Sequence, residues 1–380
     1  MKYCKRCLQP DTNPVIKLDE EQICYACRYE ESKKDIDWNA REKRLKEIAL
    51  EAKNKAKERG ISYDCVIGVS GGKDSTFQAV YAKEKLGLRP LLVNGAPDRI
   101  SKVGRENFDN LNHLGFDIIS IHPNPNIIQY LTKKLFIERG NLAAGYEYSL
   151  VASAFIIANV FNIPLIIQGE NANLTKGITT VGDKSDSAYG MASCDILKGK
   201  NATDIIKDEP NITVDDVFFS QIPDFEEMKA KNIEAIWLQY YLKEWSQVGN
   251  TEFSIARGLK GNTNVDLHDL GCYRPYSCLD SDLFIPNQLI KYLKFGYGFA
   301  TDQACYDIRE GRLSRKDAVW YVKEYDGKCG EQYITEACDY LNMTKTEFWE
   351  IVDKFVNYDL FDKVGMGKYI PKFEPGIDFE

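Results

Sequence analysis

The sequence predicts a doubly wound α/β protein with a parallel sheet, preceded by a cysteine-rich module and followed by a helical region. Three observations predict this class. Apolar segments alternate with helical patterns up to residue 171, two cysteine pairs lie near the N-terminus, and the last hundred residues contain helix-capping signals. Strands that alternate with helices form crossovers, which give a parallel sheet covered on both faces. The expected divisions are a cysteine-rich module at 1–28, a linker helix at 29–59, an α/β domain at 60–285 and a helical region at 286–380.

The elements of the α/β domain follow from periodicity and from the glycines that close each helix. Each expected strand is a short apolar run, and each helical segment repeats its apolar residues at three- and four-residue spacings. The segment 233–241, "IEAIWLQYY", is a further candidate strand. The expected strands cover 63–70, 89–96, 116–123 and 164–171, and the expected helices cover 74–87, 103–115, 127–138 and 148–160.

Two regions outside these alternations have their own signals. Residues 171–210 are rich in Gly, Ser, Thr and Asp, and a loop of that length is typical of a lid or substrate loop. In the C-terminal region, Ser314 with Asp317 and Thr344 with Glu347 have the spacing of helix capping boxes.

Composition and charge exclude several classes of protein. The chain has 380 residues, of which 44% are hydrophobic, so it can bury a sizeable core. A net charge of −8 is not the basic footprint of a nucleic-acid binder. The opening "MKYCKRC" has no apolar signal segment, which indicates a cytoplasmic protein. The longest apolar stretch, 149–169, is interrupted by Asn159, Asn162 and Pro164, so we expect a buried helix and a strand, and no membrane span.

The four N-terminal cysteines are candidate metal ligands. They form two C-x-x-C pairs, Cys4 with Cys7 and Cys24 with Cys27, a pattern that matches a tetrahedral zinc ribbon. A module this small cannot bury enough core to fold alone, so zinc would supply its folding energy. The alternative is a redox or sulfur-carrying pair. The remaining seven of the eleven cysteines are scattered and are expected to be buried small hydrophobic residues or unpaired thiols.

A glycine loop lies at the junction of the first strand and the first helix of the α/β domain. The Walker phosphate loop needs four residues between its glycines and Ser or Thr after the lysine, whereas here three residues separate Gly68 from Gly72 and Asp74 follows Lys73. The Walker interpretation therefore fails. What remains is Ser-Gly-Gly-Lys-Asp-Ser at 70–75, a pattern in which free backbone N–H groups at a helix start can hold an anion. The alternative is a tight turn that only needs small residues.

This loop resembles the PP-loop of the adenine-nucleotide α-hydrolases. The resemblance implies a site for the pyrophosphate of ATP, cleavage between the α- and β-phosphates, and Mg²⁺ as the accompanying ion. Asp74 is a possible Mg²⁺ ligand, and the alternative is a first-turn carboxylate that suits the helix dipole. The residues implied for ATP are Gly68, Val69, Ser70, Gly71, Gly72, Ser75, Val93, Asn94 and Gly169.

A second resemblance covers nearly the whole chain. The segment "YLKFGYGFATDQACYDIREGRLSRKDAVWYVKEYDGKC", the paired cysteines, "GVSGGKDS", "GEN" after the fourth strand and "SCLDSD" are similar to the N-acetyl sugar amidotransferases. These enzymes act in bacterial surface-polysaccharide (lipopolysaccharide) and pseudaminic acid biosynthesis. The resemblance implies ATP-dependent conversion of an acetamido group into an acetamidino group with ammonia. It also implies a separate glutaminase and an ammonia-channel subunit like those of histidine biosynthesis, and the sequence has no Gly-x-Cys-x-Gly nucleophile elbow of its own.

Roles in that reaction can be assigned to individual residues. The catalytic candidates are Lys73 and Asp74 in the loop, with Glu170 and Asn171 after the fourth strand, because ligands of α/β sheets lie at the carboxyl ends of strands. The resemblance implies an N-acetylated acidic sugar as substrate, for which Arg274 and Arg309 are candidate carboxylate ligands, although either could instead form a structural ion pair.

The alternative function is that of a zinc-containing PP-loop tRNA thiolase. Such an enzyme needs further active-site cysteines and a basic surface. Cys272 and Cys278 are the candidate pair, and the net charge disfavours this alternative.

Overall fold

The computed structural model describes residues 1–97, 99–177, 186–193 and 200–379. Its centre is a five-stranded sheet with the strand order β3-β2-β1-β4-β5, and every neighbouring pair is parallel. The chain builds the sheet outward from β1, first toward β3 and then toward β5, which confirms the predicted α/β class. The strands are β1 (Cys65–Gly68), β2 (Pro90–Gly95), β3 (Asp117–Ile121), β4 (Leu165–Gln168) and β5 (Glu234–Trp237).

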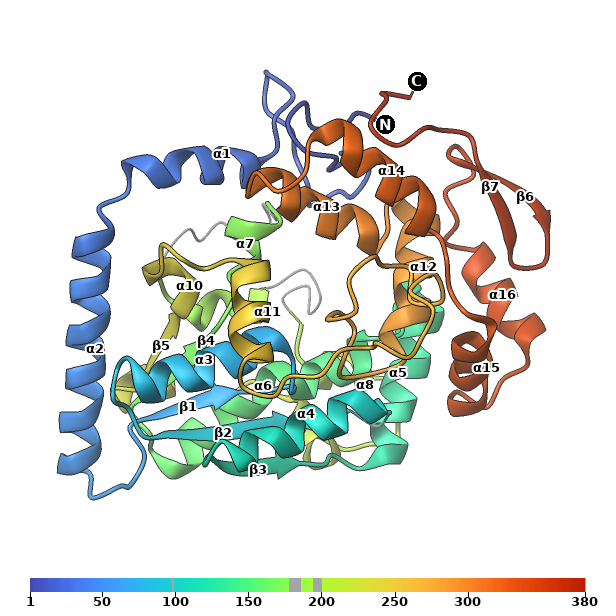
Figure 1. Cartoon of the computed structure of the whole chain (residues 1–380). Helices are drawn as coiled ribbons and strands as arrows, with labels where there is room; N and C mark the ends of the chain where they lie inside the picture. The colour runs from blue at the N-terminus through green and yellow to red at the C-terminus, as the bar shows by residue number, and fades with distance from the viewer. Residues whose placement is uncertain (98, 178–185, 194–199, 380) are drawn as a thin grey trace.

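Helices cover both faces of this sheet (Figure 1). Successive residues of a strand point to opposite faces, and here they enter two different cores. Ile67 and Leu92 pack with α2 and α3, whereas Val66 and Val93 pack with α6. The helices of this part are α2 (Trp38–Glu58), α3 (Lys73–Glu84), α4 (Lys102–His113), α5 (Pro125–Arg139) and α6 (Ala144–Phe161).

Helix α6 is the apolar helix expected before the fourth strand. By length and composition it could cross a membrane, yet 72% of it is buried inside the protein. It packs against the sheet through Phe155 and against α5 through Tyr148, both of which are fully buried. This is the environment of a core helix, as the sequence predicted.

The fifth strand is shorter than expected, and the expected loop before it contains short helices. The candidate strand at 233–241 is a strand only over β5, after which the chain turns into α10 (Leu238–Tyr241). The expected loop at 171–210 contains short helices, while its parts at 178–185 and 194–199 lie outside the described residues. The remaining elements here are α7 (Ala172–Thr175), η2 (Ala188–Ser193), α8 (Ala202–Ile206), η3 (Asp215–Ser220), α9 (Phe225–Ala230) and α11 (Gln247–Ile255).

The expected linker helix at 29–59 consists of several helical pieces. Helix α1 (Tyr25–Ser32) starts between the cysteines of the second pair and is followed by η1 (Lys33–Asp35) and α2. On α2, Leu45 and Ile48 are almost fully buried in the core that also holds β1 and α3. Helix α2 is therefore part of the α/β core as well as a connection to the cysteine module.

The C-terminal region is mainly helical, as predicted, but ends in a hairpin. Thr344 and Glu347 form a complete capping box at the start of α16, and Ser314 accepts a hydrogen bond from the Asp317 backbone at the start of α14. The antiparallel hairpin of β6 and β7 was not predicted. The elements are α12 (Phe284–Phe295), α13 (Phe299–Arg309), α14 (Arg315–Tyr325), α15 (Glu331–Tyr340), α16 (Lys345–Asp353), β6 (Phe361–Gly365) and β7 (Lys368–Pro371).

The two ends of the chain meet beside α14 (Figure 1). The Met1 amino group donates to the Phe379 carbonyl at 2.6 Å, and the Tyr3 backbone N–H donates to the Asp378 carboxylate at 2.8 Å. The cysteine module therefore packs against the C-terminal region, far from it in sequence.

Asp326 fixes the start of α13 from the neighbouring helix α14. Its buried carboxylate accepts hydrogen bonds from Gly298 N at 2.8 Å and from the Thr301 hydroxyl at 2.6 Å. We expect Asp326→Ala to lower the free energy of unfolding by about 1–3 kcal/mol, because these donors lose their acceptor in a buried place. Urea denaturation measures this. The exposed Asp359→Ala is the control and should stay within about 0.5 kcal/mol of wild type; equal losses in both variants would contradict the assigned role.

Candidate active site and metal centre

The glycine loop has the strand-turn-helix geometry that the sequence predicted. It connects β1 to α3, whose N-cap is Gly72. Gly71 has φ +80, and a Cβ atom there would lie 3.1 Å from the Gly104 carbonyl and from the Phe108 backbone nitrogen. Glycine suits this place, because a side chain would be strained in the left-handed backbone and would force α4 to move by a few tenths of an ångström. The first N–H groups of α3 are thus available at the carboxyl edge of the sheet.

Lys73 and Asp74 lie side by side in the first turn of α3. The Lys73 Nζ atom is 2.7 Å from Asp74 Oδ2, and Asp74 Oδ1 accepts a hydrogen bond from Asn250 at 2.9 Å. Ser254 donates to the Lys73 carbonyl at 2.8 Å. Asn250 and Ser254 belong to α11, so a helix far away in sequence holds the two charged residues in place. Sequence reasoning identified Lys73 and Asp74 but missed both α11 partners.

Ser75, the last residue of the loop, and the residues at the carboxyl ends of β1 and β2 form contacts that support the loop backbone. The Ser75 hydroxyl donates to the Gly72 carbonyl at 3.1 Å. Val69 N donates to Val93 O at 2.8 Å, and the Asn94 side chain donates to Val69 O at 2.7 Å. Asn94 also lines a cavity of about 290 Å³ at the carboxyl ends of β2 and β3. These contacts keep the carboxyl ends of β1 and β2 in register beside the loop.

The segment after β4 contributes one residue that faces a cavity and one that shapes the backbone. Glu170 accepts a hydrogen bond from the Tyr306 hydroxyl at 2.5 Å. Asn171 is buried, caps α7 by accepting from Asn173 N at 3.0 Å, and donates from its own N–H to Gln239 at 2.8 Å. Glu170 thus lines a cavity, and the observed contacts of Asn171 hold the backbone of this segment. Gly169 packs so closely that a Cβ atom would lie 2.1 Å from the Gln78 amide nitrogen.

A cavity of about 460 Å³ brings three parts of the chain together. The α/β domain contributes the loop residues and the segment after β4, α11 forms a second wall, and the C-terminal region forms a third. From the α/β side it is lined by Lys73, Asp74, Glu170 and Lys176.

Helix α13 supplies much of the third wall. Its cavity-lining residues stand at positions i, i+3, i+4 and i+7, so they share one face of the helix. This spacing is visible in the sequence and could have identified the face, but nothing local indicates that it meets the glycine loop. The residues are Phe299, Asp302, Gln303 and Tyr306.

The two arginines proposed as carboxylate ligands have different surroundings. Arg274 lines the cavity, but its guanidinium forms an ion pair with Asp307, which is buried. Arg309 does not line the 460 Å³ cavity; it donates to the Thr175 carbonyl at 2.8 Å and to Cys7 Sγ at 3.9 Å. Lys176, which the sequence analysis missed, lines the cavity and is exposed, and it forms no ion pair with the described carboxylates.

The four N-terminal cysteines form one buried cluster. All four Sγ atoms lie within 4.8 Å of one another, with 3.9 Å between Cys4 and Cys27 and 3.7 Å between Cys7 and Cys24. Tetrahedral zinc with bonds of about 2.3 Å requires sulfur atoms about 3.8 Å apart. The spacing therefore fits a zinc ion, and it does not fit disulfides, which need about 2.05 Å. The cluster could bind zinc through four thiolates.

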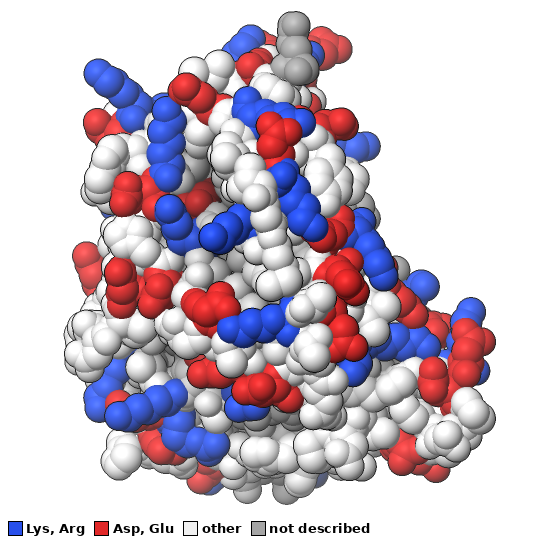
Figure 2. Space-filling model, turned by 90° about the vertical axis from the view of Figure 1, so that its right-hand side faces the viewer, with Lys and Arg blue, Asp and Glu red and all other residues white. Residues whose placement is uncertain are grey.

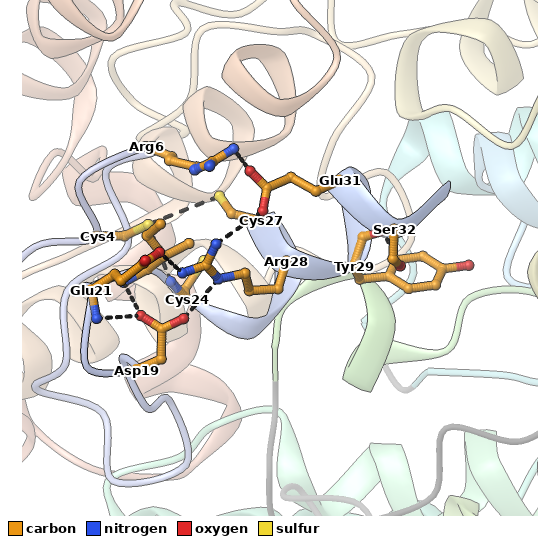
Figure 3. Close-up of polar contacts among 11 residues, drawn as sticks. Cys4, Arg6, Asp19, Glu21, Cys24, Cys27, Arg28, Tyr29, Glu31 and Ser32 are labelled. Atoms are coloured by element: carbon orange, nitrogen blue, oxygen red, sulfur yellow. Dashed lines mark hydrogen bonds and ion pairs between the residues drawn. The ribbon is translucent and has the colours of Figure 1, made fainter. Parts of the chain in front are cut away.

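Backbone and side-chain contacts support this cluster (Figure 3). Cys24 N donates to Cys4 Sγ at 3.3 Å, an N–H···S contact of the kind that stabilises a thiolate. Arg28 reaches from α1 to Asp19 at 2.7 Å and also pairs with Glu21. These ion pairs tie the loop before the second cysteine pair to α1.

The fold and the cavity define an α/β protein whose glycine loop faces a C-terminal helical region, with a cysteine cluster beside them. Residues 271–372 match the family model of the LPS biosynthesis protein WbpG-like, C-terminal domain. A search of curated proteins finds no match. The family match supports a polysaccharide biosynthesis protein and suggests an enzyme. The matched residues include Arg274 and the α13 face that lines the cavity.

Proposed function

We propose that this protein is an ATP-dependent amidotransferase that acts on an N-acetylated acidic sugar in the cytoplasm. It joins ammonia to the acetamido group and releases AMP and pyrophosphate. One observation carries the proposal: Lys73 and Asp74 of the glycine loop open into the same cavity as α13, which lies in the segment matched to the polysaccharide biosynthesis family. A nucleotide on the loop and a sugar against α13 would thus meet in one space.

The proposed chemistry accounts for all atoms. The acetamido oxygen attacks the α-phosphorus of ATP, and pyrophosphate leaves. Ammonia then attacks the imidate carbon, AMP leaves with that oxygen, and an acetamidino group remains. Activation is needed because an amide carbonyl is a poor electrophile, and the protein's contribution is positioning and stabilisation of charge.

The chain supplies groups suited to each part of this reaction. The N–H groups at the start of α3 and Lys73 would hold the departing pyrophosphate, and Asn94 lies where adenosine would meet the ends of β1 and β2. Asp74 is the loop carboxylate that would hold Mg²⁺, an ion that neutralises phosphate charge. Glu170, oriented by Tyr306, lies in the cavity where it could take a proton from the attacking ammonia.

Two further parts of the proposal concern how the sugar is bound and where the ammonia comes from. Lys176 and Arg274 line the cavity and are candidates for binding the sugar carboxylate, although Arg274 would have to do so while paired with Asp307. Ammonia would come from a separate glutaminase through an ammonia-channel subunit, both like those of histidine biosynthesis.

The thiolase alternative is disfavoured by the state of the candidate sulfur pair. Burial raises the pKa of the Cys272 thiol to about 12, and burial also raises the pKa of Cys278. Both thiols are therefore protonated at neutral pH, whereas sulfur transfer needs a thiolate. The face in Figure 2 has Lys and Arg interspersed with Asp and Glu, without the continuous basic area that tRNA would contact.

Product analysis tests the proposed function. Purified protein is incubated with Mg-ATP, an ammonium salt and candidate acetamido sugars, and the products are identified by mass spectrometry and nucleotide chromatography. The expected result is sugar-dependent formation of AMP and pyrophosphate, with a sugar product 1 Da lighter because NH replaces O. Sugar-dependent ADP and phosphate, or no nucleotide cleavage with any acetamido sugar, would contradict the proposal.

A double variant separates the two functions. Cys272→Ser with Cys278→Ser should retain turnover with free ammonia to within about threefold, because neither thiol takes part in amide activation. Thermal denaturation checks that the variant is folded. A folded double variant without activity, or tight salt-dependent tRNA binding by wild type, would favour the thiolase.

A further inference from the structure

Helix α13 has two opposite faces, each of which contacts a different site. One face carries Tyr306 and Asp302 into the 460 Å³ cavity beside the glycine loop. The other face carries Ala304, Cys305 and Ile308 into the apolar cluster that surrounds the four cysteines of the metal centre. The metal centre and the cavity therefore lie on opposite sides of this one helix.

Arg309, the last residue of α13, contacts both neighbours of this helix. Its guanidinium donates to Cys7 Sγ at 3.9 Å and to the Thr175 carbonyl at 2.8 Å. Thr175 is the last residue of α7, the short helix between the cavity residues Glu170 and Lys176. The planar guanidinium has several donors in fixed directions, so it can hold two acceptors at once.

The cysteine module also contacts α7 directly. A Cβ atom at Gly177, just after α7, would lie 3.1 Å from the backbone nitrogen of Ala26, between the cysteines of the second pair. The module thus abuts the segment that carries Glu170 on one side and α13, which carries Tyr306, on the other. The hydroxyl of Tyr306 donates to Glu170 at 2.5 Å across this junction.

We propose that Arg309 is a positioning residue that couples the metal centre to the catalytic cavity. Four thiolates around Zn²⁺ carry a net negative charge, which the Arg309 cation complements. With the metal in place, Arg309 holds the ends of α13 and α7 together and keeps the Tyr306–Glu170 pair aligned. Without it, the thiols lose that charge and the module no longer supports these two walls.

The first test measures metal retention and is independent of the proposed reaction. Zinc transfer to a chromogenic chelator is timed for wild type, Arg309→Met, Arg309→Lys and the control Lys316→Met, an exposed cation on α14. We expect Arg309→Met to release zinc about tenfold faster or more, because a charge-assisted hydrogen bond to a ligand is lost. Arg309→Lys should be intermediate, and Lys316→Met should match wild type. Release from Arg309→Met at the wild-type rate would overturn the proposal.

The second test follows the walls of the cavity by hydrogen exchange. In Arg309→Met, and in wild type stripped of zinc, residues 299–309 and 172–177 should exchange faster, while β1 and α3 keep their protection. Unchanged exchange in both segments would overturn the proposed coupling, even if zinc release were faster. Loss of protection across the whole sheet would also overturn it, since that would indicate general unfolding.

The third test uses the proposed activity and rests on it. A positioning role predicts a lower kcat for Arg309→Met with KM for the sugar within about threefold of wild type. A raised KM with normal zinc release would instead assign Arg309 to the substrate carboxylate and would refute the positioning role. If wild type shows no amidotransferase activity, the first two tests still decide the coupling, so the failure of the two proposals can be distinguished.

Discussion

Replacing Lys73 by alanine is expected to lower kcat for AMP formation by about 100- to 1,000-fold, the cost of removing one well-placed group that stabilises developing charge. The Lys73 side chain is only 18% exposed and lies at the start of α3, where the departing pyrophosphate would be held. Its Nζ atom lies 2.7 Å from Asp74 Oδ2, and residues 70–75 contain no other Lys or Arg that could replace it. Steady-state measurement of AMP and pyrophosphate gives the size of the loss.

The matched control for this prediction is Lys85→Ala at the other end of the same helix. Lys85 is exposed at the C-cap of α3, so its removal changes the net charge equally without touching the cavity. Lys85→Ala should keep wild-type activity, and circular dichroism should show both variants folded. If Lys73→Ala keeps kcat within threefold of wild type, the glycine loop is not the phosphate site.

Replacing one zinc ligand, as in Cys24→Ser, is expected to abolish stoichiometric zinc binding and to unfold the N-terminal module. All four sulfur atoms lie within 4.8 Å, so the loss of one leaves an incomplete site. Structural zinc contributes on the order of 10 kcal/mol in small modules, far more than the few apolar side chains here can supply. Metal analysis should fall from about one zinc per chain to well below half, with a lower melting temperature.

Cys329→Ala is the matched control for the zinc prediction. Cys329 is partly buried in the C-terminal region and is not among the four clustered cysteines. This variant should retain one zinc per chain. Limited proteolysis should cleave within residues 1–35 in Cys24→Ser and should leave that segment intact in Cys329→Ala. Full zinc content in Cys24→Ser, or wild-type protein without zinc after expression in zinc-supplemented medium, would refute the zinc site.

The hairpin at the C-terminus shows what the sequence analysis missed and why. Gly365 ends β6 and Gly367 lies in the turn before β7, a local signal that was present but outweighed by the surrounding helical pattern. A Cβ atom at Gly367 would lie 2.5 Å from the Trp349 ring, so packing against α16 selects this turn. Tertiary contact made a strand pair from residues whose local preference was weak.

The residues of the candidate site also fall into two groups: those that local sequence identifies and those that only tertiary contacts bring to the site. Residues 70–75 could be recognised because a strand, a glycine turn and a helix start are adjacent in sequence and determine one another locally. Asn250 and Tyr306 could not, since each acts through a residue more than 130 positions away, Asp74 and Glu170 respectively. The sequence shows which residue types are present, but it does not show that Asn250 contacts Asp74 or that Tyr306 contacts Glu170.

The sequence by itself determined the parallel sheet, the glycine loop and the four clustered cysteines, because periodicity, turn chemistry and ligand spacing act over a few residues. Only the tertiary structure decided that α13 stands between the cysteine cluster and the cavity, and that Arg309 faces Cys7 and Thr175. The physical reason is that these contacts join segments from both ends of the chain, and their energies depend on burial and on distance in space, which local sequence does not encode.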